Sequence, residues 1–167
     1  MMANRSLLDR VVVCAVSPSS TAVQWCLGQY FEELDKRLPK GFERDRDVLT
    51  DHTEFSGAGC VFLVASMDGH WVGCGGFKRL NSASACIKRM WVDEAWRGKG
   101  IGRHLLTLLE NQAKDLGYSV VKLETNRLLH EAIQLYRSQG YQEVTPFVEE
   151  PCADYWFEKS LESGVPE

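Results

Sequence analysis

The residues with the clearest capacity for chemistry form a glycine-rich loop that carries basic side chains, from Arg97 to Arg103. Leucines recur at helical spacing immediately after the loop and continue until Gly117, so the loop opens an amphipathic helix. Backbone N–H groups at a helix N-terminus have no intrahelical partner and attract anions, and glycine lets a phosphate approach the backbone closely. The loop therefore predicts a binding site for a diphosphate.

Three phosphate-binding patterns can be compared with this loop. The P-loop requires a lysine followed by serine or threonine at its end, whereas here the lysine lies inside the loop and an arginine closes it. The dinucleotide fingerprint G-x-G-x-x-G fits Gly98 and Gly100 but meets Arg103 in place of its third glycine. Glu124, about 20 residues further on, keeps this pattern open as an alternative. The third pattern, Arg/Gln-x-x-Gly-x-Gly/Ala, is matched in full from Arg97 to Gly102.

The loop and its flanks resemble the GNAT family of N-acetyltransferases. The segment 87–106 is similar to the family's fourth strand, signature loop and third helix, and 131–141 is similar to its next helix and turn. Segments near both ends also resemble a bacterial subgroup that occurs fused to MarR-type DNA-binding domains. The resemblance is strongest over 61–159 and implies one N-acetyltransferase domain spanning 1–167, whose loop holds the pyrophosphate of acetyl-coenzyme A (acetyl-CoA).

The order of the predicted elements indicates an α/β (α+β) fold with a mixed, mostly antiparallel sheet flanked by helices. Strand-like runs at 60–66 and 71–78 are joined by an Asp-Gly turn and should pair antiparallel. A strand at 119–125 follows the helix after the loop, so it should lie parallel to the central strand that ends at Val92. In the GNAT family these two parallel strands splay apart and hold the pantetheine arm between them.

The remaining elements are predicted from capping signals and apolar periodicity. A strand at 10–17 precedes a helix that begins with a capping box at Thr21 and Gln24 and ends before Pro39. A charged helix is expected at 44–52, another helix at 131–139, and closing strands at 141–145 and 154–159.

Two details are expected within the central sheet. Regular alternation in the central strand would place Ile87, Arg89 and Trp91 on one face. Glycines at 73, 75 and 76 in the preceding strand indicate a bulge or a close backbone approach.

The resemblance implies roles for residues around the predicted cofactor site. Tyr136 occupies the position of the tyrosine that commonly serves as the family's general acid, and a phenol with an ordinary pKa near 10 keeps its proton at neutral pH. A tyrosine packed in the core is the alternative interpretation. The family's oxyanion donor is usually a backbone N–H, here near Met90 to Val92. The residues expected to bind the cofactor are Met90, Trp91, Val92, Arg97, Gly98, Lys99, Gly100, Ile101, Gly102, Arg103 and Asn126.

The general base is left open because the resemblance fails at one position. Many relatives carry a glutamate directly before the Ile-Lys-Arg-Met run, where this chain has Cys86, and a neutral thiol is a poor substitute for a carboxylate. Glu33 and Glu124 are candidate replacements on the substrate side, although either could be a surface or structural carboxylate, and bulk water could take the proton from an amine of low pKa. The asparagine that other branches carry before the Tyr136 helix is replaced by Leu129.

Charge and composition restrict the partners. The net charge of −4 and the pI near 5.6 argue against DNA as the main partner. Acidic residues of the first helix, Glu32, Glu33 and Asp35, form either a solvated face or a surface that meets a cationic acceptor. The apolar run at 11–16 is too short to cross a bilayer. Six scattered cysteines lack metal or redox spacing, so they are expected to be small buried residues of a cytoplasmic protein with no metal site.

The function that these patterns favour is acetyl transfer from acetyl-CoA to a primary amine of a small molecule or amino-acid-like acceptor, by direct attack on the thioester. The sequence does not determine the oligomeric state, and a homodimer is one possibility. Two other classes stay as alternatives: a non-catalytic acyl-CoA-binding sensor, which the missing carboxylate at Cys86 would suit and Tyr136 would not, and a nucleotide-dependent oxidoreductase.

Overall fold

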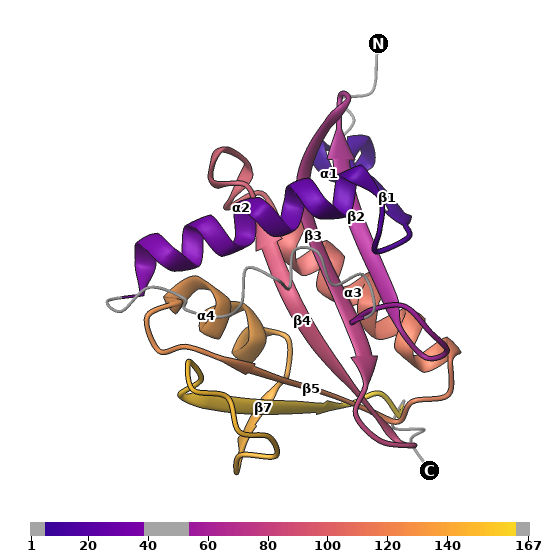
Figure 1. The fold of residues 1–167 in the computed structure, drawn as a ribbon, viewed down its shortest axis with the longest axis vertical. Coiled ribbons are helices and arrows are strands. Elements are labelled where there is room, and N and C mark those ends of the chain that lie inside the picture. Colours follow the sequence, from indigo (N-terminus) through magenta and orange to yellow (C-terminus); the bar gives the residue numbers. More distant parts are fainter. Residues whose placement is uncertain (1–5, 39–53, 163–167) are drawn as a thin grey trace.

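The computed structural model describes residues 6–38 and 54–162, and these form a seven-stranded sheet with the order β1-β2-β3-β4-β5-β7-β6 (Figure 1). Only β4 and β5 pair in parallel within this sheet, and the other described pairs are antiparallel. The predicted helix at 44–52 lies outside the described residues. The strands are β1 (Val12–Ala15), β2 (Val61–Met67), β3 (His70–Arg79), β4 (Ser84–Val92), β5 (Val120–Thr125), β6 (Gln142–Val144) and β7 (Tyr155–Ser160).

Helices cover both faces of the sheet and give it two apolar cores. Helix α2 crosses in front of the strands in Figure 1, whereas α3 lies behind them. Buried residues of α2 pack with Phe62, Cys74 and Trp91 in one cluster, and α3 and α4 pack with the second, larger cluster. The predicted mixed sheet with flanking helices is therefore confirmed. The helices are α1 (Leu7–Arg10), α2 (Thr21–Arg37), α3 (Ile101–Asp115) and α4 (His130–Ser138).

The N-cap of helix α2 lies one residue before the predicted capping box. The N-cap is Ser20, whose hydroxyl accepts a hydrogen bond from the Val23 N–H at 3.3 Å. Thr21 is the first helical residue, so its predicted role as the cap is wrong. Both residues are good caps in isolation, but the hydroxyl that reaches the third N–H of the helix is the one that fills an unpaired donor.

The β2–β3 hairpin confirms the predicted antiparallel pair and its Asp-Gly turn. Asp68 and Gly69 both have positive φ, 49° and 83°, as a two-residue turn with the right-handed strand twist requires. The glycines of β3 lie where a side chain would collide: a Cβ at Gly73 would come within 2.9 Å of the Trp91 carbonyl oxygen, and one at Gly76 within 2.8 Å of the Val61 carbonyl oxygen. The predicted close backbone approach is confirmed.

Strand β4 contains a bulge that changes which residues share a face. The pairing with β3 shifts register so that Gly75 alone lies opposite both Arg89 and Met90. Arg89 has φ +62°, in the left-handed region that a side chain other than glycine seldom adopts. The bulge inserts one extra residue and reverses the alternation of the strand.

This bulge makes the predicted common face of Ile87, Arg89 and Trp91 wrong. Ile87 packs in the core that contains α3, whereas Trp91 packs in the core that contains α2. The guanidinium of Arg89 lies over the rings of Tyr30 and Phe31 on α2, with 5.8 and 5.2 Å from its carbon to the ring centroids. A period of two cannot be continued through a residue that has no partner in the ladder.

The parallel strands β4 and β5 separate soon after they start. Their paired residues run only from Ser84 with Val120 to Cys86 with Lys122, although β4 continues to Val92 and β5 to Thr125. The predicted splay is thus confirmed. Among residues 6–38 and 54–162, no strand pairs with the β5-facing edge of the second half of β4, and the cavities described below lie in this region.

The cysteines do not all fit the expectation of small buried residues. Cys26, Cys74 and Cys86 are buried, but Cys14 on the edge strand β1 is exposed, and none of the six cysteines forms a disulfide with another described residue. Among the described residues, no group of three or more His, Cys, Asp or Glu side chains is placed to hold a metal ion. Within the same residues, none of the helices combines the length and apolarity needed to span a membrane.

Candidate active site

A cavity of about 530 Å³ lies between α2, the end of β4, the glycine-rich loop and α4. It brings together most of the residues predicted to bind the cofactor, together with the proposed acid and one of the candidate acidic residues. Lys99 and Asn126 are the predicted cofactor residues that do not line it. The predicted residues that do line it are Glu33, Met90, Trp91, Val92, Arg97, Gly98, Gly100, Ile101, Gly102, Arg103 and Tyr136.

The loop and the first turn of α3 line this cavity. Gly98 and Gly100 have φ of +74° and +88°, so the two turns that direct the chain into α3 use conformations that favour glycine. Gly100 is the N-cap of α3 and has no side chain to accept from the first turn, whose N–H groups lack intrahelical partners. This end of α3 can therefore donate several hydrogen bonds to an anion.

Arg97 connects the loop to both β4 and α2. Its Nε donates to the carbonyl oxygen of Val92 at 2.9 Å, and its Nη2 forms an ion pair with the carboxylate of Glu33. Glu33 therefore lies beside the glycine-rich loop. An anion bound at the loop would share Arg97 with this carboxylate.

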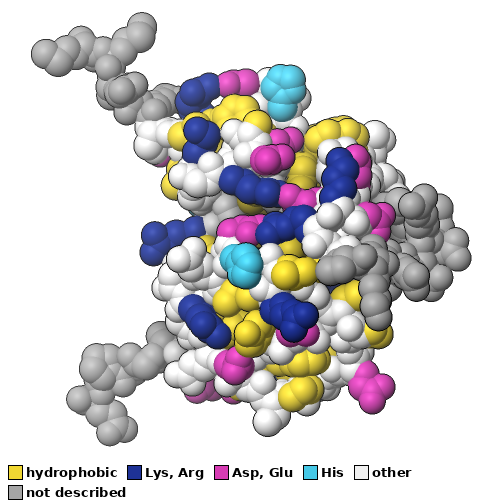
Figure 2. Space-filling model, turned by 90° about the vertical axis from the view of Figure 1, so that its left-hand side faces the viewer, with side chains coloured by type: hydrophobic (Ala, Val, Ile, Leu, Met, Phe, Trp, Pro, Cys, Tyr) yellow, Lys and Arg dark blue, Asp and Glu magenta, His cyan; other side chains and the backbone are white. Residues whose placement is uncertain are grey.

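A second ion pair joins α2 to α4 across the same cavity. Arg37 pairs with Glu131, and its Nη2 also donates to the Leu128 carbonyl oxygen at 3.1 Å. The hydrogen bond from Arg37 lowers the pKa of Glu131. Figure 2, which shows the side toward which the C-terminal end of α2 points, has acidic and basic side chains side by side across its middle. The pairing of Arg37 with Glu131 was not predicted from the sequence, because a helix sequence does not indicate which charged side chain on another helix it will meet.

Tyr136 is buried at the wall of the large cavity. Its ring contacts Tyr141 and Phe157, with centroids 5.8 and 6.2 Å away, and its side of α4 is packed in the main core. Burial raises the pKa of Tyr136, and the neighbouring Tyr30 and Glu124 raise it further, so its hydroxyl stays protonated through the neutral range. Among the described residues, the structure records no hydrogen bond from this hydroxyl. Core packing and an available proton therefore coexist at this residue.

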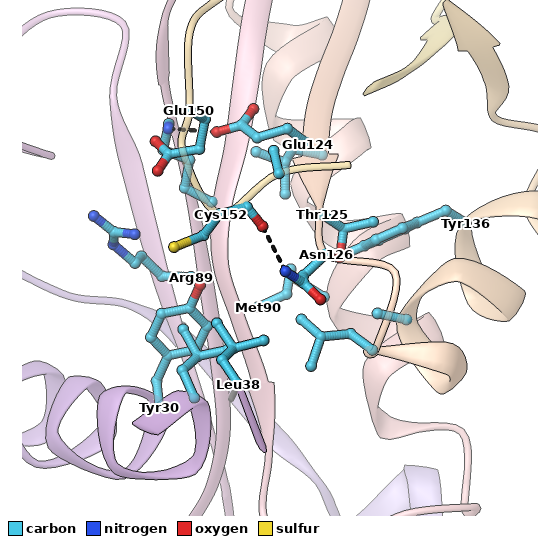
Figure 3. Close-up of a pocket in the computed structure, with 16 residues that line it drawn as sticks. Tyr30, Leu38, Arg89, Met90, Glu124, Thr125, Asn126, Tyr136, Glu150 and Cys152 are labelled. Atoms are coloured by element: carbon cyan, nitrogen blue, oxygen red, sulfur yellow. Dashed lines mark hydrogen bonds and ion pairs between the residues drawn. The ribbon is translucent and has the colours of Figure 1, made fainter. Parts of the chain in front are cut away.

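A smaller cavity of about 90 Å³ adjoins the large one where β4 and β5 diverge (Figure 3). Tyr136 and Met90 line both cavities, so they stand where the two meet. Asn126 lines the smaller cavity, but its amide is occupied: Nδ2 donates to the Cys152 carbonyl oxygen at 2.8 Å and Oδ1 accepts from the Leu128 N–H at 2.9 Å. Asn126 thus fixes the turn before α4 and the loop that contains Cys152.

The smaller cavity contains a buried carboxylate close to Cys86, the position at which this chain lacks the glutamate of many relatives. The carboxylate of Glu124 on β5 accepts a hydrogen bond from the thiol of Cys86, with Sγ 3.6 Å from Oε2. It also pairs with the ammonium of Lys88, whose Nζ lies 2.7 Å from Oε1. The Glu124 side chain is 7% exposed and that of Lys88 is 11% exposed. A neighbouring strand therefore supplies a carboxylate beside the position of Cys86.

The groups around Glu124 cannot act as bases themselves. Burial, reinforced by the charge of Glu124, raises the pKa of Cys86 to about 12, which keeps the thiol neutral. Burial alone would lower the pKa of Lys88, but the carboxylate of Glu124 outweighs it and the net pKa is raised. The contact of Lys88 with Glu124 was not predicted from the sequence, although a lysine two positions from Cys86 on a central strand is itself a signal of a polar cavity.

Comparisons with known proteins agree with this geometry. A family model described as the acetyltransferase (GNAT) family matches residues 27–141, from within α2 to the end of α4 and its following turn. The chain belongs to the GNAT family. A protein of Azospirillum brasilense called an IAA acetyltransferase is 34% identical over 141 residues, which cover 84% of this chain and 90% of that protein. The N-alpha-acetyltransferase RimI of Mycobacterium tuberculosis is 33% identical over 119 residues, covering 70% of this chain and 68% of the relative.

Solved structures show the same GNAT fold. An acetyltransferase of the GNAT family from Staphylococcus aureus superposes with a TM-score of 0.77 at 20% identity, over 91% of this chain and 99% of that one. The structure of yncA, a putative acetyltransferase from Salmonella typhimurium with its cofactor acetyl-CoA, superposes with a TM-score of 0.70 at 18% identity, over 95% and 98%. GNAT membership makes this chain an acyltransferase.

Proposed function

We propose that this GNAT chain transfers an acetyl group from acetyl-CoA to the primary amine of a small molecule or amino-acid-like acceptor. The observation that carries the proposal is the position of Tyr136. Its protonated hydroxyl stands where the large cavity at the glycine-rich loop meets the smaller cavity that holds Glu124. A proton donor that borders both cavities and a carboxylate that lines the smaller one suit a transfer in which the amine loses a proton and the leaving thiolate gains one.

The residues of the large cavity fit acetyl-CoA. The unpaired N–H groups at the start of α3, with Arg97 and Arg103 beside them, provide donors and positive charge for a diphosphate. Beyond Cys86, the edge of β4 that faces β5 lacks a strand partner, so its backbone groups are available to an extended amide-containing arm. When bound, acetyl-CoA supplies a thioester that is activated toward attack by an amine.

One side chain donates the proton that the leaving sulfur needs, and another accepts the proton that the amine loses. The Tyr136 hydroxyl carries a proton at neutral pH and donates it to the sulfur that leaves. The Glu124 carboxylate receives the proton of the amine, directly or through a water molecule, since Lys88 stays cationic and Cys86 stays neutral. A backbone N–H between Met90 and Val92, on the edge that β5 does not cover, donates to the developing oxyanion.

The proposed acceptor side is small, which supports a small molecule. The smaller cavity of about 90 Å³ holds few heavy atoms beyond an amine and its immediate substituents. The names of the relatives include both an IAA acetyltransferase and an N-alpha-acetyltransferase, so they do not choose between acceptor classes.

A panel of primary amines tests the proposal directly. The protein is incubated with acetyl-CoA and each amine, and free thiol release and N-acetyl product are measured together. Transfer to at least one small amine is expected. Tight CoA binding by calorimetry without transfer to any amine would contradict the proposal and favour an acyl-CoA sensor.

A further inference from the structure

Leu129 occupies a position where a leucine serves neither helix capping nor core packing. It is the N-cap of α4, and its side chain makes no capping hydrogen bond. Serine, threonine, asparagine and aspartate are preferred at an N-cap, because their side chains accept from the first free N–H groups of the helix. Among the described residues, Leu129 also belongs to neither of the two apolar cores. Its apolar side chain therefore has another role.

The side chain of Leu129 lies at the junction of the two cavities. Leu129 lines both of them, as Met90 and Tyr136 do, and Leu34 also lines both. Leu34, Met90 and Leu129 are called the apolar collar below. They come from α2, from β4 and from the turn before α4, so three separate elements bring apolar side chains to one junction.

The smaller cavity becomes polar on its β5 side. Glu124, Thr125 and Asn126 line this cavity but not the large one (Figure 3). Glu124 is paired with Lys88, and the amide of Asn126 is hydrogen-bonded to backbone. An apolar chain that extended past the collar would remove water from these groups without offering a hydrogen bond, which costs free energy. The junction therefore suits a short apolar group better than a long one.

We propose that Leu129 determines the choice of acyl donor: with Leu34 and Met90 it contacts the acyl group of the thioester and favours acetyl over longer acyl groups. This inference rests on the proposed function and adds a specificity-determining residue to it. With CoA in the large cavity, the acyl group is the part of the donor that enters the collar. Each added carbon also takes room from the amine, because the smaller cavity measures only about 90 Å³.

A series of acyl donors provides the first test. Wild-type protein is given acetyl-CoA, propionyl-CoA or butyryl-CoA with the best amine found, and free thiol release is measured. One carbon more or less in an apolar pocket changes kcat/KM by about 10- to 200-fold, so butyryl-CoA should fall at least about 10-fold below acetyl-CoA. Equal kcat/KM for these two donors would overturn the inference while leaving acyl transfer intact.

Matched leucine variants provide the second test. Leu129→Ala widens the collar, so it should raise the ratio of kcat/KM for butyryl-CoA to that for acetyl-CoA by about 10-fold or more. Leu135→Ala is the control, because Leu135 lies on α4 and lines the large cavity but not the smaller one. Its ratio should equal that of wild type, and any rise in KM should be the same for every donor. An unchanged ratio in folded Leu129→Ala would overturn the inference.

Leu129→Ser separates donor selection from helix stability. Serine is a good N-cap and is close to alanine in size, so Leu129→Ser should unfold at a higher urea concentration than Leu129→Ala. Both variants widen the collar, so both should raise the butyryl-to-acetyl ratio to a similar extent. A ratio that followed the unfolding midpoint instead of the size of the side chain would show a structural role only, and would overturn the inference.

Calorimetry separates a failure of this inference from a failure of the proposed function. CoA and the thioether S-ethyl-CoA, which cannot transfer its ethyl group, are titrated into each protein without an amine. A buried carbon improves affinity about 4-fold, so S-ethyl-CoA should bind wild type about 10-fold more tightly than CoA. Leu129→Ala should lose most of this gain, and Leu135→Ala should keep it.

This result would support the acyl contact even if no amine is acetylated, an outcome that would overturn only the proposed transfer. Equal Kd values for CoA and S-ethyl-CoA in wild type, or a gain that Leu129→Ala retains in full, would overturn the contact with Leu129.

Discussion

The thiol of Cys86 on β4 donates to the carboxylate of Glu124 on β5, with Sγ and Oε2 3.6 Å apart. This contact joins the position where relatives were expected to carry a glutamate to a glutamate on the adjacent strand. The two strands are in register only up to Cys86 and Lys122, so the contact lies where the sheet begins to open. A carboxylate can thus reach the same cavity from either strand.

Replacement of Tyr136 by phenylalanine tests the proton donor. The variant keeps the ring contacts with Tyr141 and Phe157 but removes the hydroxyl, so the fold and CoA binding should survive. Positioned general acids contribute about 10²- to 10⁴-fold, and a thiolate is a fair leaving group, so kcat should fall toward the lower end of that range. Steady-state turnover and CoA titration of both proteins measure this. Wild-type turnover under conditions where chemistry limits would make Tyr136 a core residue only.

Glu124→Gln tests the proton acceptor. We expect kcat/KM for the amine to fall by about 10²- to 10⁴-fold, because the amide cannot take up a proton, while the Kd for CoA stays the same. The variant should also unfold more easily, by about 1–3 kcal/mol, because the largely buried Lys88 loses its charged partner. Glu158→Gln is the control: it removes a carboxylate from the adjacent strand β7 that pairs with Lys122. Equal turnover of the two variants would assign proton removal to water.

Glu33→Gln distinguishes a cofactor-side role from an acceptor-side role. Because Glu33 occupies Arg97 in the structure, its neutral replacement should free the arginine and tighten CoA binding by about 2- to 5-fold, equivalent to a partly exposed ion pair. The KM for the amine should not change. Glu32→Gln, one residue away and paired with Lys36, should leave both constants unchanged. A rise in amine KM with constant CoA affinity would instead support a role for Glu33 in binding the acceptor.

Thiol labelling over a pH series tests the environment of Cys86. A thiol with a pKa of about 12 is almost entirely protonated at pH 8 to 9, and only the thiolate reacts. Exposed Cys14 should therefore react with iodoacetamide at an ordinary rate in the native protein, whereas Cys86 should remain unmodified until the chain unfolds. Peptide mass spectrometry identifies the labelled positions. Rapid native labelling of Cys86 at pH 8 would contradict the buried contact with Glu124.

A pair of glycine substitutions tests the close approach inside the sheet. A Cβ at Gly76 would meet the Val61 carbonyl oxygen at 2.8 Å, and backbone cannot move aside, so Gly76→Ala should destabilise by about 1–3 kcal/mol. Gly28 lies inside α2 with no neighbouring atom within 4 Å of its would-be Cβ, so Gly28→Ala should stabilise by about 0.5–1 kcal/mol. Denaturant titrations compare both with wild type. Gly76→Ala as stable as wild type would contradict the observed packing.

The parts of the structure that could be predicted from sequence are those set by local signals. The hairpin turn at Asp68 and Gly69 needs positive φ at both residues, and an Asp-Gly pair predicts such a turn. The glycine-rich loop before α3 is similarly local, since its residue types suit one backbone path. These signals located the β2–β3 pair, the loop and the following helix.

The bulge and the charged pairs could not be predicted in this way. The φ of +62° at Arg89 goes against the usual preference of a side chain, and it is maintained by contacts with α2 and with Glu54. The pairings of Glu33 with Arg97 and of Glu124 with Lys88 join residues that are 64 and 36 positions apart. Spacing along one helix or strand carries no information about such partners, because it is the tertiary fold that brings them together.

The single extra residue in β4 also fixes the number of residues that β4 needs between Cys86 and Trp91. If one residue were deleted between Cys86 and Trp91, regular alternation would carry Trp91 to the face of α3 and remove its edge contact with Trp25, whose centroid is 5.9 Å away. The number of residues in this short segment therefore determines the face on which Trp91 lies, whatever the types of those residues. A protein engineer who exchanges segments between GNAT chains should match that spacing before matching any side chain.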